Sequence, residues 1–355
     1  MSGRAFDLIV FDLDGVILSE EGYLDAAALT AASFAKRLGT AWPAGLADPE
    51  DVVSGAEAAA LRGRFLPASL VQELRARAVN SNWDKALAAV LLFTLLRRQA
   101  GADEVGVAGE QAAALLGRYG ETGKDLLDLL LAQAAEAALE AVEAVEAVEA
   151  DGPARTTVRR FREGDGRAAG GSGLALRGLV VDRFQAYFLG DTRARTSWLR
   201  AGLAAHERCM TDCAALRAAL ERLRAYGYVL GVGTGRPRAE AQRALQTLGL
   251  WTLFDESRTV TIDEVRQEEE RTGAPEGAFA KPHPFTFTAA AKGVASARVL
   301  VVGDSPADLL AARAAGLRFV GIGRRDRFLH PEYAEVYLPA ATDLADWLAE
   351  TRQSK

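Results

Sequence analysis

Two aspartates separated by one residue stand near the start of the chain, directly after a largely apolar run. Asp12 and Asp14 follow Phe6–Phe11, and Gly15 comes next. Paired carboxylates at such a position outline a reaction centre. Two anions this close repel each other by roughly 4 kcal/mol at about 4 Å and an effective dielectric near 20. The rest of the chain should therefore supply a compensating cation.

Three later segments carry the other candidate residues. They are Thr234-Gly235-Arg236, Lys281, and Asp304 with Asp308. A hydroxyl and free N–H groups at a helix start can hold phosphate oxygens, although Thr234 could also be a plain helix cap. Lys281 is the candidate cation. Arg236 could contact a phosphate or substrate, and a solvated arginine at a helix start is the equal alternative.

Alternating strand and helix patterns position these residues. The segments 228–233, 259–262, 298–303 and 317–322 have the apolar pattern of buried strands, and helical patterns separate them. Together with the first strand they predict an α/β fold, a three-layer, Rossmann-like parallel sheet with helices on both faces. Each candidate residue follows a predicted strand or lies in a loop beyond one, so all should converge on one crevice at the carboxyl ends.

A long helical insertion interrupts this core. Residues 19–206 are rich in alanine, leucine, arginine and glutamate at helical spacing, which predicts an all-helical domain between core segments 1–18 and 207–355. The glycine density of 151–173 is typical of a flexible loop. Its arginines, Arg155, Arg159, Arg160 and Arg162, could meet an anionic substrate or form a solvated linker face.

Composition limits the class of protein. The 355 residues are 49% hydrophobic and 25% charged, as in globular proteins, and allow two domains. A net charge of −6 gives no reason to expect a nucleic-acid partner. The longest uncharged apolar run, 86–96, is too short to span a membrane, so we expect a buried helix there.

The two cysteines, Cys209 and Cys213, provide no disulfide framework and favour a reducing cytoplasm. A metal-binding pair is the alternative, but no cluster of Cys or His accompanies them. A strand that begins within about five residues of Met1 leaves no room for a signal peptide. We therefore expect a cytoplasmic protein.

The order of these motifs resembles the haloacid dehalogenase superfamily, specifically its phosphatase branch. Asp-x-Asp-Gly-Val at 12–16 is followed by an apolar strand with Thr234-Gly235, then Lys281-Pro282, then Gly-Asp-Ser-x-x-Asp at 303–308. The motif-bearing resemblance covers residues 1–18 and about 207–323. The insertion resembles the helical cap of the family's first cap class, although it is far longer.

The resemblance implies a role for each residue. Asp12 would be the nucleophile that forms an aspartyl phosphate, and Asp14 would protonate the leaving oxygen and later take a proton from water. The second acid favours phosphate esters over carbon–halogen bonds. Thr234, Gly235 and Lys281 would bind the phosphate, and Lys281 would also neutralise Asp12. The alternatives are turn aspartates and a surface lysine.

A divalent metal completes the predicted site. Asp304 would hold Mg²⁺ with the Asp12 carboxylate and, by resemblance, the backbone carbonyl of Asp14. Asp308 could support the metal, but Ser305-x-x-Asp308 is also a capping box, and both roles can coexist. Two nucleotide-binding motifs are absent from the sequence. The glycines at 231, 233 and 235 lack the spacing of a dinucleotide fingerprint, and no P-loop sequence occurs.

These expectations combine into a Mg²⁺-dependent phosphatase that hydrolyses a small phosphorylated metabolite through an aspartyl phosphate. The alternatives are a phosphomutase like β-phosphoglucomutase and a catalytically silent binding protein of the same fold. Substrate identity is left open, as is the choice between monomer and homodimer. Tyr187, Phe188 and Trp198 could line the cap, or they could belong to its core.

Overall fold

A computed structural model describes residues 5–39, 42–77, 79, 81–100, 109–146, 171–328 and 330–353. The chain divides into two units, and each is described by itself. The core unit consists of Met1–Glu20 and Glu207–Lys355, and the cap unit of Glu21–His206. The predicted loop at 151–173 and its four arginines lie outside the described residues, except for the last three positions of the loop.

The core unit contains a six-stranded parallel sheet in the order β3-β2-β1-β4-β5-β6. The strands are β1 (Leu8–Phe11), β2 (Val229–Gly233), β3 (Thr259–Val260), β4 (Val299–Gly303), β5 (Arg318–Ile322) and β6 (Val336–Leu338). The central strand β1 pairs with β2 and β4, so that Phe11 lies opposite both Val232 and Val302. The predicted α/β class is confirmed.

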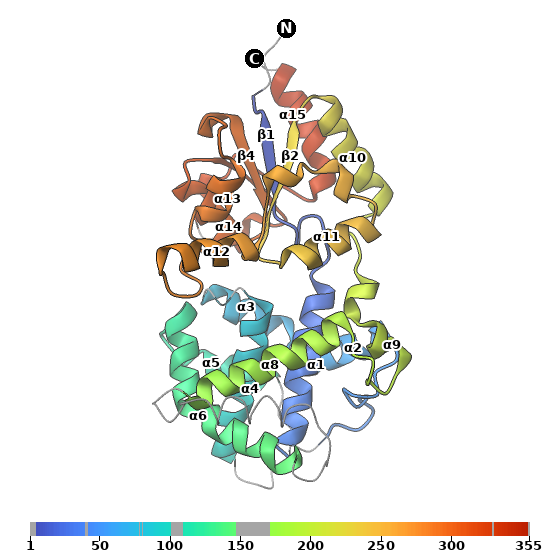
Figure 1. Cartoon of the computed structure of the whole chain (residues 1–355), viewed down its shortest axis with the longest axis vertical. Coiled ribbons are helices and arrows are strands. Elements are labelled where there is room, and N and C mark those ends of the chain that lie inside the picture. The colour runs from blue at the N-terminus through green and yellow to red at the C-terminus, as the bar shows by residue number, and fades with distance from the viewer. Residues whose placement is uncertain are drawn as a thin grey trace. The chain divides into compact units, whose positions relative to one another are not determined.

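Helices cover both faces of the sheet because successive strand residues point to opposite sides. Ile9 and Phe11 pack in one apolar cluster with α10 (Cys213–Ala225), α11 (Arg238–Thr247) and α15 (Leu344–Gln353). Leu8 and Val10 pack in another with α13 (Phe285–Ala290) and α14 (Pro306–Ala314). In Figure 1, α10 and α15 lie on one side of the central strands and α13 and α14 on the other. The core therefore has three layers, as predicted.

Several core elements were missing from the sequence prediction. The acidic segment before Lys281 is a regular helix, α12 (Ile262–Thr272), with a capping box between Thr261 and Glu264 and a left-handed Gly273 at its end. The sheet also has a sixth strand, β6, which is only three residues long, followed by α15. The three residues of β6 are too few to show an apolar period, and α12 buries only Val265 and Glu269.

The segment that leads back from the insertion pairs with the chain just after Gly15. Ser19 donates its backbone N–H to Arg208 O, and Met210 donates to Ile17 O. Cys209 and Cys213 are joined by a disulfide, with a Cα–Cα distance of 5.4 Å. The expectation of two unbonded cysteines was therefore wrong. Asp212 caps α10 between them, and the resulting turn brings the two cysteines together.

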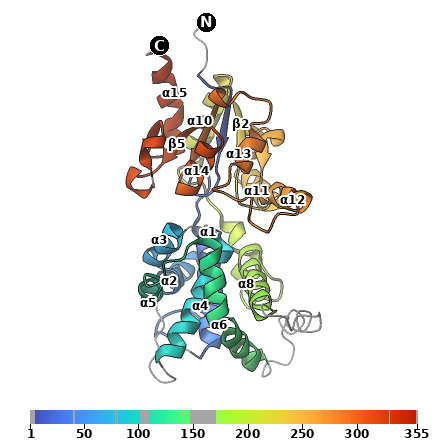
Figure 2. The same ribbon diagram turned by 90° about the vertical axis from the view of Figure 1, so that its left-hand side faces the viewer.

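Helices are the regular secondary structure of the cap unit wherever the structure describes it. Its longer helices are α1 (Glu21–Arg37), α2 (Gly55–Phe65), α3 (Ala68–Ala76), α4 (Asn82–Ala100), α5 (Gly109–Leu116), α6 (Gly123–Glu146) and α8 (Gly171–Leu189), followed by the short α9 (Ser197–Ala201). Helix α4 packs against both α1 and α6, as Figure 2 shows. The apolar run at 86–96 lies in α4 and is mostly buried, as expected. Across the described residues, no helix combines the length and hydropathy needed to span a bilayer.

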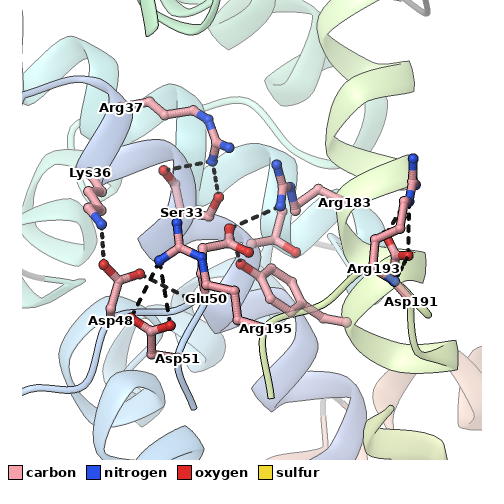
Figure 3. A network of polar contacts seen from close by, with 12 residues as sticks. Ser33, Lys36, Arg37, Asp48, Glu50, Asp51, Arg183, Asp191, Arg193 and Arg195 are labelled. Atoms are coloured by element: carbon pink, nitrogen blue, oxygen red, sulfur yellow. Dashed lines mark hydrogen bonds and ion pairs between the residues drawn. The ribbon is translucent and has the colours of Figure 1, made fainter. Parts of the chain in front are cut away.

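A polar network ties the connection after α1 to α8 and the chain that follows it (Figure 3). Glu50 accepts hydrogen bonds from Arg183 and from the Tyr187 hydroxyl, each at 3.0 Å. Burial, together with Glu50, raises the pKa of Tyr187 above its usual range. Tyr187 and Phe188 are buried in the apolar core of the cap, and Trp198 packs against that core. The structure therefore supports the core alternative for these aromatic residues.

Candidate active site

The candidate residues gather where three neighbouring strands end. Asp12 directly follows the last residue of β1, Thr234 that of β2, and Asp304 that of β4. Phe11 lies opposite Val232 and Val302, so the end of β1 lies within one residue of the ends of β2 and β4. Lys281 reaches the same place from the loop between α12 and α13.

Lys281 connects the two buried aspartates of the site. Its Nζ lies 2.9 Å from Asp12 Oδ1 and 2.6 Å from Asp308 Oδ1, and it also donates to the Gly233 carbonyl at 3.3 Å. The ring centroid of Phe287 lies 5.4 Å from the same nitrogen. Lys281 thus provides a cation beside Asp12 and Asp308.

The electrostatics of this cluster show an excess of negative charge. The pKa of Asp12 is raised to about 7, mainly by burial and also by Asp308 and Asp14, against the opposing effect of Lys281. Burial alone would lower the pKa of Lys281, but Asp12 and Asp308 outweigh it and raise that pKa above its usual range. Burial and the neighbouring carboxylates together outweigh Lys281 at Asp12, so a further cation would favour the charged form of Asp12.

Asp308 has a structural role as well as a place in the site. It is fully buried, and its Oδ2 accepts hydrogen bonds from the Ser305 hydroxyl at 2.6 Å and from the Ser305 amide at 3.3 Å. Ser305 Oγ accepts from the Asp308 amide in return, which completes the capping box at the start of α14. The other oxygen of Asp308 binds Lys281. The capping box thus orients Asp308 so that it can hold the lysine.

Asp304 lies against the backbone that follows Asp14. Gly15 has a φ of +77°, and a Cβ there would lie 2.2 Å from Asp304 Oδ2, so only glycine leaves room for that carboxylate. Asp12, Asp304 and Asp308 each offer a ligand oxygen, and these oxygens lie within 4.8 Å of one another. Three clustered carboxylates fit a hard divalent cation such as Mg²⁺. The Asp14 side chain lies outside this cluster, and its predicted ligand atom is the backbone carbonyl.

Thr234 and Gly235 form a turn before the next helix. Thr234 is buried, donates its amide to Val260 O at 3.0 Å, and accepts the Arg236 amide on its Oγ1 at 3.2 Å. Helix α11 begins only at Arg238, and its N-cap is Pro237, so the plain-cap alternative for Thr234 was wrong. Gly235 is exposed, and a Cβ there would meet no atom within 4 Å. Its backbone is therefore open to a ligand.

Arg236 occupies an unexpected position. Its side chain is only 2% exposed, so the alternative of a solvated arginine was wrong. Its Nε lies 3.1 and 3.0 Å from the two carboxylate oxygens of Asp14, and its Nη2 lies 2.5 Å from Oδ1. Nη1 binds Glu207 Oε1. One guanidinium therefore holds two carboxylates.

Comparison with known proteins identifies the family and the fold of the chain. A family model described as haloacid dehalogenase-like hydrolase matches residues 6–316. The chain belongs to the haloacid dehalogenase-like hydrolase family. An X-ray structure from a structural genomics consortium has the same fold, with a TM-score of 0.67 and 21% identity over 98% of this chain and 100% of that one.

Curated relatives of this haloacid dehalogenase-like hydrolase match only part of it. A phosphoglycolate phosphatase of Pasteurella multocida is 31% identical over 136 residues, which cover 38% of this chain and 50% of that protein. A phosphoglycolate phosphatase of Cereibacter sphaeroides is 35% identical over 102 residues, or 29% and 40% of the two chains. The chain thus spans about half the length, or less, of these relatives.

Sequence reasoning missed Glu207 in this haloacid dehalogenase-like chain. Its side chain is 4% exposed, and burial raises its pKa despite the opposing Arg236. It lies at the point where the chain returns to the core unit and follows no strand or motif. An isolated glutamate carries no local signal, so only the folded arrangement identifies it.

Proposed function

We propose that the protein is a Mg²⁺-dependent phosphatase that hydrolyses a small phosphorylated metabolite through an aspartyl-phosphate intermediate. The observation that carries this proposal is the Asp12 carboxylate, which Lys281 holds at the end of β1 and which clusters with Asp304, while the open backbone of Gly235 follows the neighbouring strand β2. This arrangement offers a nucleophile, positive charge and phosphate-binding groups within one site of the core unit.

In the first step, a carboxylate oxygen of Asp12 would attack phosphorus while the bond from phosphorus to the ester oxygen breaks. Asp14 would give its proton to the departing oxygen, so that an alcohol leaves. Lys281 would offset the negative charge that gathers on the phosphoryl oxygens. The Thr234 hydroxyl and the Gly235 amide would orient the same group.

In the second step, water would attack the phosphorus of the aspartyl phosphate. Asp14, now ionised, would take a proton from that water, and the bond between phosphorus and Asp12 would break. Inorganic phosphate leaves, and both aspartates return to their starting forms. Two carboxylates with different surroundings suit this division, since Asp12 is buried against Lys281 whereas Asp14 is 21% exposed and bound by Arg236.

The residues that would hold Mg²⁺ are Asp12 and Asp304, together with the backbone carbonyl of Asp14. Asp308 would support them, because one of its oxygens binds Lys281 and the other binds Ser305. A bound Mg²⁺ would supply positive charge to the phosphoryl oxygens. The tight fit of Asp304 against Gly15 supports this assignment, since it keeps the carboxylate beside the Asp14 backbone.

The first substrate to test is 2-phosphoglycolate, because both relatives named above are phosphoglycolate phosphatases. A panel of other small phosphate monoesters extends the test. The absence of a nucleic-acid or membrane partner and a cytoplasmic location remain predictions.

The test compares wild type with Asp12→Asn on 2-phosphoglycolate and on 4-nitrophenyl phosphate, with millimolar Mg²⁺. We expect phosphate release by the variant to fall at least about a thousandfold, because the nucleophile is lost. Asp7→Asn is the matched control: Asp7 precedes the same strand at its opposite end and pairs with Arg298 at 2.6 Å. Full turnover by Asp12→Asn would refute the assignment of Asp12 as the nucleophile. With a hexose 1-phosphate as substrate, an isomerised sugar phosphate in place of inorganic phosphate would indicate a mutase.

A further inference from the structure

Asp14, the proposed acid and base, is held by a chain of two side chains that the family motifs do not include. Arg236 binds both carboxylate oxygens of Asp14 through Nε and Nη2. Its remaining terminal nitrogen, Nη1, binds Glu207. Because a guanidinium is planar, a contact at Nη1 also limits rotation of the edge that binds Asp14.

The backbone around Glu207 is firmly held within the core unit. The backbone of Arg208 is hydrogen-bonded to Ser19, and that of Met210 to Ile17. Between them, Cys209 is joined by the disulfide to Cys213 at the start of α10. This pairing fixes the position from which the Glu207 side chain reaches Arg236.

A contribution to stability does not explain why position 207 is a glutamate. Among the described residues, its Oε2 is buried without any hydrogen-bond partner. A buried ion pair with an unsatisfied oxygen is a poor stabilising element, since apolar side chains in place of both partners would fill the space without that penalty. A role in placing Arg236 explains why a carboxylate occupies this position.

We propose that Glu207 and Arg236 are positioning residues for Asp14. Glu207 holds the guanidinium plane, and the guanidinium in turn holds the Asp14 carboxylate in one orientation. This inference rests on the proposed function, because Asp14 is its acid and base. The consequence concerns the leaving group: proton donation matters for an alcohol that leaves poorly and little for a nitrophenol that leaves well.

The experiment measures leaving-group release in a single turnover, with enzyme in excess, which isolates the first step. The substrates are 2-phosphoglycolate, or the alkyl phosphate that wild type prefers in the panel, and 4-nitrophenyl phosphate. For Glu207→Ala we expect alcohol release to slow at least about tenfold and nitrophenol release to change less than about threefold. Glu207→Gln keeps an oxygen for Arg236 Nη1, so it should restore the rate of alcohol release.

Two further variants complete the design. Arg236→Lys keeps the positive charge but loses the planar fork, so it should show the same selective loss even if Glu207→Ala does not fold. Glu335→Ala is the matched control, because Glu335 pairs with Arg318 at the opposite, amino-terminal end of the strands. It should release both leaving groups at wild-type rates.

Each outcome has a defined meaning. Equal slowing of both leaving groups in Glu207→Ala and Arg236→Lys would overturn the positioning role while the phosphatase proposal stands. Unchanged alcohol release in these variants would do the same, as would a Glu207→Gln variant as slow as Glu207→Ala. A wild type that releases neither leaving group would overturn the proposed function and this inference with it.

Discussion

Neutralising Asp12 should stabilise the metal-free protein at neutral and alkaline pH. Asp12 is only 7% exposed, and its pKa is raised to about 7, mainly by burial and then by Asp308 and Asp14 against the opposing Lys281. The charged carboxylate is therefore a source of instability when no divalent cation is present. Asp12→Asn replaces it with a neutral side chain of nearly the same shape.

The magnitude follows from linkage between proton binding and folding. The ordinary pKa of an aspartate is about 3.8, so between pH 4 and pH 7 the folded state binds a proton at Asp12 that the unfolded state has lost. The free energy of unfolding of wild type therefore falls as pH rises through this window. A pKa shift of about three units corresponds to a loss of roughly 4 kcal/mol in the free energy of unfolding above pH 7. This loss vanishes near pH 4.

The assay is calorimetry of both proteins in EDTA at several pH values. The core transition of Asp12→Asn should lie about 10 °C above that of wild type at pH 8, since 1 kcal/mol corresponds to about 2–4 °C in a domain of this size. The difference should shrink toward pH 4, where Asp12 is protonated in wild type. Asp7→Asn should show no such pH-dependent gain, because Asp7 is half-exposed and lies outside the cluster.

Magnesium provides the second arm of this prediction. Millimolar Mg²⁺ should raise the transition temperature of wild type, because it binds the folded carboxylate cluster and not the unfolded chain. Mg²⁺ should raise the transition temperature of Asp12→Asn less, so the transition temperatures of the two proteins should become more similar. An Asp12→Asn variant that is no more stable than wild type at pH 8 in EDTA would refute the electrostatic reasoning. So would a stability gain that is constant from pH 4 to pH 8.

Two other predictions test the surroundings of the site. Gly15→Ala should weaken the Mg²⁺-dependent rise in transition temperature, because a Cβ at 2.2 Å from Asp304 Oδ2 would displace that carboxylate; an unchanged Mg²⁺ titration would contradict this account. Cys209→Ser should lower the free energy of unfolding of the core by about 2 kcal/mol, the loop-closure value for so short a loop. Denatured wild-type protein should show no free thiol without reductant, and two titratable thiols would argue against the disulfide.

The sequence predicted the catalytic end of the sheet because its signals are local. A buried strand is recognised from its own apolar residues, and Asp12, Thr234 and Asp304 each come directly after one. Parallel strands bring their carboxyl ends together, so strand position alone predicts that these residues meet. The capping box of Asp308 was also readable, since it depends on residues only three positions apart.

The short elements were not readable in the same way. Strand β6 has three residues, and α12 is a polar helix whose apolar stripe is too sparse to stand out. Contacts with the rest of the core stabilise them, and their own residues carry too little periodic signal. The disulfide also depends on a turn that folding creates, so cysteine spacing alone gave the wrong expectation.

The partner of Asp14 was decided by tertiary structure alone. Arg236 and Asp14 are 222 positions apart in the chain, and Glu207 joins them from a third segment. From sequence, Arg236 looked equally suited to a ligand or to solvent, because burial and charge pairing are properties of the packed chain. The sequence by itself determined which residue types stand at the strand ends. Only the fold decided which charged side chains are buried next to each other, and this joint burial determines the partner of each carboxylate in the site.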